Sequence, residues 1–126
     1  MDHLRCQIDQ PLADVESRVR AALAAEGFGI LSEIDVAATL RAKLGVERAP
    51  LRVLGACNPA LINEALAREP DVALALPCNV VLEALSETTT QVTIADPAQL
   101  MSDPRLADLV ADARQHLGRA LDEIAS

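Results

Sequence analysis

Residues 52–79 read RVLGACNPALINEALAREPDVALALPCN, and the rest of the chain is organised around this stretch. It holds two of the three cysteines, Cys57 and Cys78. Each of them is followed directly by an asparagine, Asn58 or Asn79, and each lies close to a proline. The repeated chemistry suggests two similar turns at the ends of two strands, although two residues are too few to indicate a duplication.

The first of these turns predicts a helix start. Asn58 is a favourable N-cap, and Pro59 suits the first helical position because its missing N–H has no partner there anyway. Residues 51–56 are therefore predicted as a strand and residues 59–68 as a helix. Cys57 then lies just outside a helix N-terminus, where the helix dipole tends to lower the pKa of a thiol, whereas burial raises it.

Hydrophobic periodicity extends the prediction outward in both directions. Further strands are predicted at residues 3–8, 29–34, 72–76, 80–85 and 88–94, with a hairpin turn at Ser86 and Glu87. Helices are predicted between Pro11 and Gly27, between Asp35 and Gly45, and from Pro104 almost to residue 126. In the last helix, Leu109 and Leu117 are expected to be buried against the sheet. The pattern predicts one α+β domain over residues 1–126, with a mainly antiparallel sheet and helices packed on one face.

Composition excludes several classes of function. Hydrophobic residues make up 51% of the chain, but Phe28 is the only aromatic residue, so the core is expected to be aliphatic. A net charge of −8 and scattered cations argue against nucleic-acid binding. No apolar run reaches the ~18–20 residues of a membrane helix. Three cysteines without a recognisable signal peptide predict reduced thiols and a cytoplasmic location.

Three blocks of the sequence are similar to one known family. They are residues 27–36, GFGILSEIDV, residues 52–59, RVLGACNP, and residues 76–81, LPCNVV. In this order and spacing they resemble the domain-of-unknown-function family 302 (DUF302) over nearly the whole chain. The residues that match its motifs are Glu33, Asp35, Gly55, Cys57, Asn58, Pro59, Pro77, Cys78 and Asn79.

The resemblance implies a small bacterial or archaeal protein with a TBP-like fold, in which a curved antiparallel sheet is backed by helices. It also implies a homodimer, and it brings no established activity. An aliphatic chain with strands as apolar as residues 72–85 is itself expected to leave surface for a partner to cover, which points to a two-fold symmetric homodimer.

The candidate ligand-binding residues are Glu33, Cys57, Asn58, Cys78 and Asn79. Two thiols that face one site are able to bind a soft metal, carry sulfur or switch by oxidation. The structural alternative is a pair of buried cysteines beside turns that need Asn and Pro for backbone reasons. Glu33 would act as a base or hard ligand if it shares a pocket with the thiols, and is otherwise a surface carboxylate. Asp35 is expected to cap a helix.

Three functions remain open at this point. The first is a dimeric binding module whose cysteine-containing site takes a small molecule, a soft metal or a reactive sulfur species. The second is a thiol-dependent enzyme with Cys57 as nucleophile, assisted by Glu33 or Asp35. The third is a plain interaction scaffold. No metal-spaced motif, cofactor fingerprint or catalytic triad is visible, so the sequence assigns no metal ligands, cofactor or catalytic residues.

Overall fold

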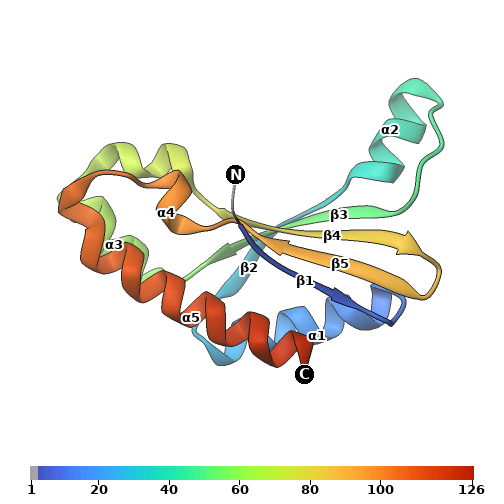
Figure 1. The fold of residues 1–126 in the computed structure, drawn as a ribbon. Coiled ribbons are helices and arrows are strands. Elements are labelled where there is room, and N and C mark those ends of the chain that lie inside the picture. Colours follow the sequence, from blue (N-terminus) through green and yellow to red (C-terminus); the bar gives the residue numbers. More distant parts are fainter. Residues whose placement is uncertain (1–2) are drawn as a thin grey trace.

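The computed structural model describes residues 3–126 and is built on a five-stranded, open, antiparallel sheet. The strands lie in the order β1-β5-β4-β3-β2 (Figure 1). Their bounds are β1 Leu4–Ile8, β2 Gly29–Asp35, β3 Leu51–Cys57, β4 Cys78–Ser86 and β5 Thr89–Ile94. The helices are α1 Leu12–Ala25, α2 Val36–Leu44, α3 Pro59–Arg68, α4 Pro97–Leu100 and α5 Ala107–Ala125, with two 3-10 helices, η1 Pro70–Ala75 and η2 Pro104–Leu106. The predicted α+β class is confirmed.

The main core lies between the sheet and the helices α1 and α5, which run side by side beneath it (Figure 1). Leu54 of β3, Leu82 of β4 and Leu117 of α5 are fully buried there. Phe28 is also buried, and the remaining side chains of this core are aliphatic, as the composition predicts. A second, smaller core of Ala65, Val72, Leu106 and Val110 joins α3, η1 and the start of α5.

Local signals in the sequence place most of the element boundaries correctly. Gly27 follows α1 with φ 86°, the left-handed conformation that glycine adopts without steric cost. Asp35 caps α2, because its Oδ1 accepts a hydrogen bond from the N–H of Ala38 at 2.9 Å. The hairpin turn lies one residue later than predicted, at residues 87–88, because β4 continues through Ser86.

One predicted strand is wrong. Residues 72–76 lie mostly in the 3-10 helix η1, which begins at Pro70 and is capped by the side chain of Glu69. Val72 is buried, but Leu74 is 90% exposed. An apolar run this short has no decisive period, and a proline at the first position favours a helical turn over a sheet ladder.

The last helix also differs in detail from its prediction. A 3-10 turn, η2, precedes α5, so the regular helix begins at Ala107. Leu117 is fully buried in the main core, as expected. Leu109 is only half-buried and packs on the smaller core rather than on the sheet. Val110 and Leu106 are the residues that fill that core.

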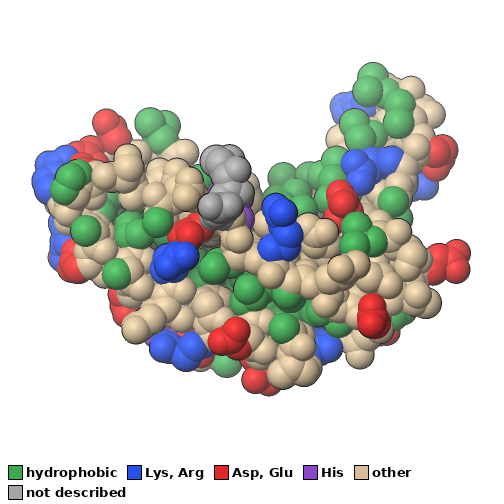
Figure 2. All heavy atoms as spheres, in the orientation of Figure 1, with side chains coloured by type: hydrophobic (Ala, Val, Ile, Leu, Met, Phe, Trp, Pro, Cys, Tyr) green, Lys and Arg blue, Asp and Glu red, His purple; other side chains and the backbone are tan. Residues whose placement is uncertain are grey.

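A long arm projects from the body of the domain. It consists of α2 and residues 45–50, which follow the end of β2, and α2 stands away from the other helices (Figure 1). No residue of α2 is buried, and residues 41–50 are all exposed. The surface is hollowed between this arm and the lobe that α3, η1 and α4 form at the other end of the sheet (Figure 2). Within residues 3–126, no helix has the length and apolar character to cross a membrane.

Candidate functional site

Cys57 and Cys78, which are 21 positions apart in the sequence, line one small cavity. Cys57 ends β3 and Cys78 begins β4, and the antiparallel register pairs Cys78 with Ala56, the neighbour of Cys57. The helices α3 and α5 close the cavity from the other side, with Leu61 and Val110 among its walls. The strand register therefore brings the two thiols together, as the functional interpretation of the sequence required.

The turn after Cys57 has the predicted structure. The side chain of Asn58 accepts a hydrogen bond from the N–H of Leu61 at 3.2 Å, and Pro59 occupies the first turn of α3. Asn58 therefore fixes the start of α3 while its side chain also lines the cavity. Its amide lies close to Gly27 as well, since a Cβ added to Gly27 would approach its Nδ2 to 3.1 Å.

The cavity is small and almost wholly apolar. Its volume is about 30 Å³, and its other walls are mainly aliphatic side chains, together with Phe28 and Met101. A cavity needs roughly 10–15 Å³ to hold one water molecule, whereas pockets for drug-sized ligands measure about 300–1,000 Å³. The space therefore suits a single small atom or ion next to the two sulfurs.

Burial governs the ionisation of the thiols. It raises the pKa of Cys57 above the ordinary thiol value, so the lowering expected from the N-terminus of α3 is not found. Burial also raises the pKa of Cys78, and the nearby charge of Cys57 raises it further. The pKa of Cys6 is raised by burial and lowered in part by Arg18. The three cysteines are free, and near neutral pH they are predominantly protonated thiols.

A metal would find few ligands here. In the part of the chain that the structure describes, no group of three or more His, Cys, Asp or Glu side chains is arranged to hold a metal ion. A soft ion in the cavity would have the two sulfurs of Cys57 and Cys78 as its side-chain ligands of these types.

The other two predicted ligand residues lie elsewhere. Asn79 is exposed, and its carbonyl oxygen accepts a hydrogen bond from the N–H of Ala95 at 2.9 Å. Glu33 pairs with Leu54 in the register of β2 and β3, so it points toward the helix-covered side of the sheet, where α1 meets it. Neither residue lines the thiol cavity.

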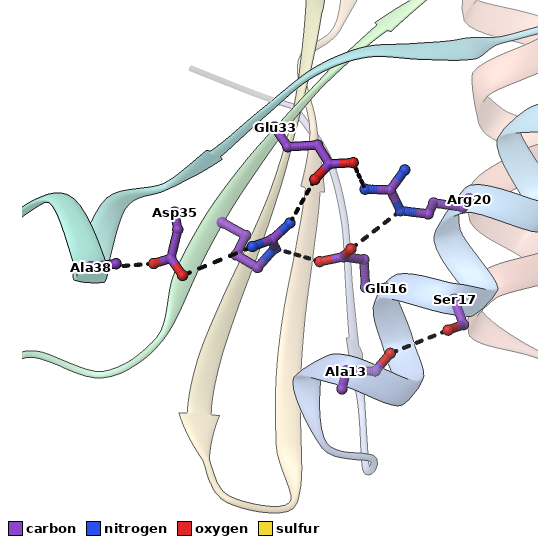
Figure 3. Close-up of polar contacts among 8 residues, drawn as sticks. Ala13, Glu16, Ser17, Arg20, Glu33, Asp35 and Ala38 are labelled. Carbon is purple, nitrogen blue, oxygen red and sulfur yellow. Dashed lines mark hydrogen bonds and ion pairs between the residues drawn. The ribbon is translucent and has the colours of Figure 1, made fainter.

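Glu33 instead belongs to a cluster of ion pairs (Figure 3). Glu33 binds Arg20 at 2.6 Å and Arg52 at 3.3 Å. Glu16 binds the same two arginines, at 3.2 Å and 2.5 Å, which closes a four-membered ring between α1, β2 and β3. Asp35 lies 3.9 Å from Arg52 at the edge of this ring.

Within the ring, Arg20 is the main cause of the lowered pKa of Glu33, and Arg52 lowers it further. A carboxylate held ionised by two arginines makes a poor general base. The ring ties the base of the arm to α1, so the structure gives Glu33 an anchoring role. Only Arg52, a cation within the apolar run of β3, was a signal of this ring in the sequence.

We predict that the three thiols react at different rates with iodoacetamide. Cys57 is half-buried and lies at a helix N-terminus, whereas Cys6 packs against the main core and Cys78 is 5% exposed. Cys57 should therefore label first. Cys78 should label last, because it is more deeply buried than Cys6. The alkylation rates of Cys57 and Cys78 should keep rising at pH values above the ordinary pKa of a thiol. The reason is that the thiolate is the reactive form and burial raises the pKa of both cysteines.

Peptide mapping after timed alkylation of folded protein measures these rates. Denatured protein is the control, because its three cysteines should label at similar rates. Labelling of Cys6 at least as fast as Cys57 in the folded state would contradict the site assignment.

The fold and the site together define a small α+β domain with an open antiparallel sheet and two thiols that line one apolar cavity. The family model "Domain of unknown function DUF302" matches residues 4–124, and the chain belongs to this DUF302 family. The resemblance seen in the sequence is thereby confirmed.

A solved structure supports the same assignment. The chain is similar to the crystal structure of an uncharacterized conserved DUF302 protein from Bacillus stearothermophilus, with 28% sequence identity and a TM-score of 0.86. The alignment covers 98% of each chain. No curated protein is a significant match.

Proposed function

We propose that the protein is a dimeric, cytoplasmic binding module whose site is the cavity between Cys57 and Cys78. Its ligand is a sulfane sulfur atom, which Cys57 carries as a persulfide. The observation that carries this proposal is the pairing of two thiols in one apolar cavity of about 30 Å³. The volume fits one added sulfur atom, while the small-molecule alternative needs about ten times more space.

The transfer conserves oxidation state overall. The thiolate of Cys57 attacks the outer sulfur of a persulfide donor, R–S–SH, and a new S–S bond forms as the donor's own S–S bond breaks. The electron pair leaves with the inner sulfur as R–S⁻, and the proton stays on the transferred atom, giving Cys57–S–SH. The raised pKa of Cys78 keeps a neutral neighbour beside this group, and the apolar walls limit access of water.

Two further observations argue against the soft-metal and enzyme alternatives. Among the residues that the structure describes, the cavity offers two thiols and no third strong metal ligand. Two side-chain ligands of this kind are few for a soft ion. The enzyme alternative needs a second residue that assists Cys57, but Glu33 is held by Arg20 and Arg52 and does not line the cavity.

The proposal is tested by offering reduced protein a small persulfide, glutathione persulfide, and measuring the intact mass. We expect one added sulfur atom on the wild-type protein and on Cys6→Ser, and none on Cys57→Ser. An equal gain by Cys57→Ser would overturn the assignment. A parallel sample receives cuprous ion under anaerobic conditions.

The cuprous sample separates the remaining alternatives. Binding of one copper per chain that needs both Cys57 and Cys78, without any sulfur adduct, would replace sulfur by a soft metal. If neither reagent binds, the binding module is overturned and the interaction scaffold is the remaining function. Light scattering at micromolar concentration tests the dimer, and a monomeric mass would contradict that part of the proposal.

A further inference from the structure

The arm and the lobe at opposite ends of the hollowed face are complementary to each other. The arm carries α2, a helix of nine residues with no buried side chain. Isolated helices shorter than about 12–15 residues are marginal in water, so α2, which contacts mainly β3 within one chain, gains stability when another surface covers it. Val36, Leu40 and Leu44 follow one another at helical spacing, and Leu44 is 71% exposed.

At the other end of the sheet, η1 and α4 enclose a groove of about 610 Å³. Leu74 and Leu100 line this groove and are 90% and 39% exposed. The domain therefore has two separate exposed apolar surfaces. One is Leu44 on the arm, and the other is the pair Leu74 and Leu100 in the groove.

The charges of the two surfaces are opposite. α2 carries Arg41 and Lys43 and no acidic residue, and within residues 3–126 neither cation forms an ion pair. The groove is lined by Glu69, Asp71 and Asp103, of which Glu69 and Asp103 share one cation, Arg105. A net negative groove therefore matches a net positive helix in a protein whose overall charge is −8.

The arrangement within one chain keeps these surfaces apart. α2 and the lobe lie at opposite ends of the sheet, with the hollow between them (Figures 1 and 2). A second copy turned by a two-fold axis and placed face to face brings its α2 over the lobe of the first copy. The same operation places the first copy's α2 over the lobe of the second.

We infer that the occupant of the groove is α2 of a second copy of this chain. In such a dimer the arm of each copy covers the groove of the other copy across the hollow. Leu44 and its neighbours on the helix cover Leu74 and Leu100, and Arg41 and Lys43 face the acidic side chains of the groove. This inference rests on the proposed dimer and specifies its interface, and it is independent of the sulfur ligand.

The test uses one variant on each surface. Leu44→Glu alters the arm and Leu74→Glu alters the groove, and both positions are exposed in the single chain, so each variant should fold. Because a charge placed in the centre of an interface disrupts a hot spot, each variant alone should raise the dimer dissociation constant at least about 30-fold. Ala24→Glu, which adds the same charge on the exposed side of α1, is the matched control and should leave the dimer unchanged.

Mixing the two variants gives a stricter test. A heterodimer of Leu44→Glu with Leu74→Glu contains one intact arm–groove pair and one pair altered on both sides, whereas each homodimer has two altered pairs. Native mass spectrometry of the mixture should therefore show the heterodimer in excess over both homodimers. Arg41→Glu with Lys43→Glu should also dissociate the dimer, and adding Asp71→Lys in the same chain should restore part of the affinity.

The outcomes separate this inference from the proposed function. If the wild-type protein is dimeric and both leucine variants dimerise with wild-type affinity, the reciprocal arms are overturned while the dimer stands. A monomeric wild-type protein overturns both the arms and the dimer, and the persulfide experiment is unaffected. A groove that binds only some other basic helix would leave the variants and the wild type equally monomeric, which also overturns the inference.

Discussion

Leu117→Ala is expected to lower the free energy of unfolding by about 2–5 kcal/mol. Leu117 is fully buried in the main core, where α5 packs against α1 and the sheet. The substitution removes three carbon atoms from a closely packed site, and the rigid sheet on one side limits how far the neighbours can relax into the space. Both the lost transfer free energy and the new cavity therefore count against the folded state.

Leu109→Ala on the same helix is the matched control. Leu109 is only half-buried and belongs to the periphery of the smaller core. Leu109→Ala should therefore lower the free energy of unfolding clearly less than Leu117→Ala does. Urea unfolding at one fixed protein concentration measures both variants, so that any self-association contributes equally to the two midpoints. A negligible shift of the midpoint for Leu117→Ala would mean that α5 does not pack as described.

The elements that the sequence predicts well are those with strong local signals. Asn58 with Pro59 and Asp35 mark helix starts through hydrogen bonds that span three residues, and Gly27 marks a helix end through one backbone angle. The strand predicted at residues 72–76 is wrong because an aliphatic run of five residues has no decisive period, and the local feature that favours a helical turn, Pro70, lies before the run.

The thiol cavity shows a different limit of prediction from the sequence. That Cys57 and Cys78 share a cavity depends on the register of β3 and β4, in which Cys78 lies opposite Ala56. Register is set by long-range packing, so the repeated Cys-Asn pairs suggested the site but did not establish it. The ring of Glu16, Arg20, Glu33 and Arg52 joins three elements, and only the place of Arg52 within the apolar run of β3 indicated it in the sequence.

The exposure of α2 on the arm could not be predicted from the sequence for a related reason. The apolar stripe of α2 has the spacing of an ordinary core-facing helix, so the sequence predicts a packed helix there. The structure leaves Leu44 exposed and Val36 and Leu40 only half-buried within one chain. A stripe read from a sequence therefore shows that a helix has a face to bury, but it does not show whether the covering surface belongs to the same chain or to another.

Gly55→Ala is expected to destabilise the fold by about 1–3 kcal/mol, although alanine normally suits a strand better than glycine does. Gly55 lies within β3 and pairs with Ser32 on one side and Asn79 on the other. A Cβ at this position would lie 2.2 Å from Oγ of Ser32 and 2.6 Å from Cγ of Pro77. The serine hydroxyl can rotate away, but the proline ring cannot, so the backbone around Pro77 must move.

That movement would reach the thiol cavity, because Pro77 is joined to Cys78. We therefore expect Gly55→Ala to speed the alkylation of Cys78 relative to Cys57 as well as to lower the urea midpoint. Gly29→Ala is the control, since a Cβ there meets nothing within 4 Å, and its stability should stay within about 0.5 kcal/mol of the wild type. Adding Ser32→Gly to Gly55→Ala should recover little, because it relieves only the flexible contact. Full recovery would show that Ser32, and not the ring of Pro77, requires a glycine at position 55.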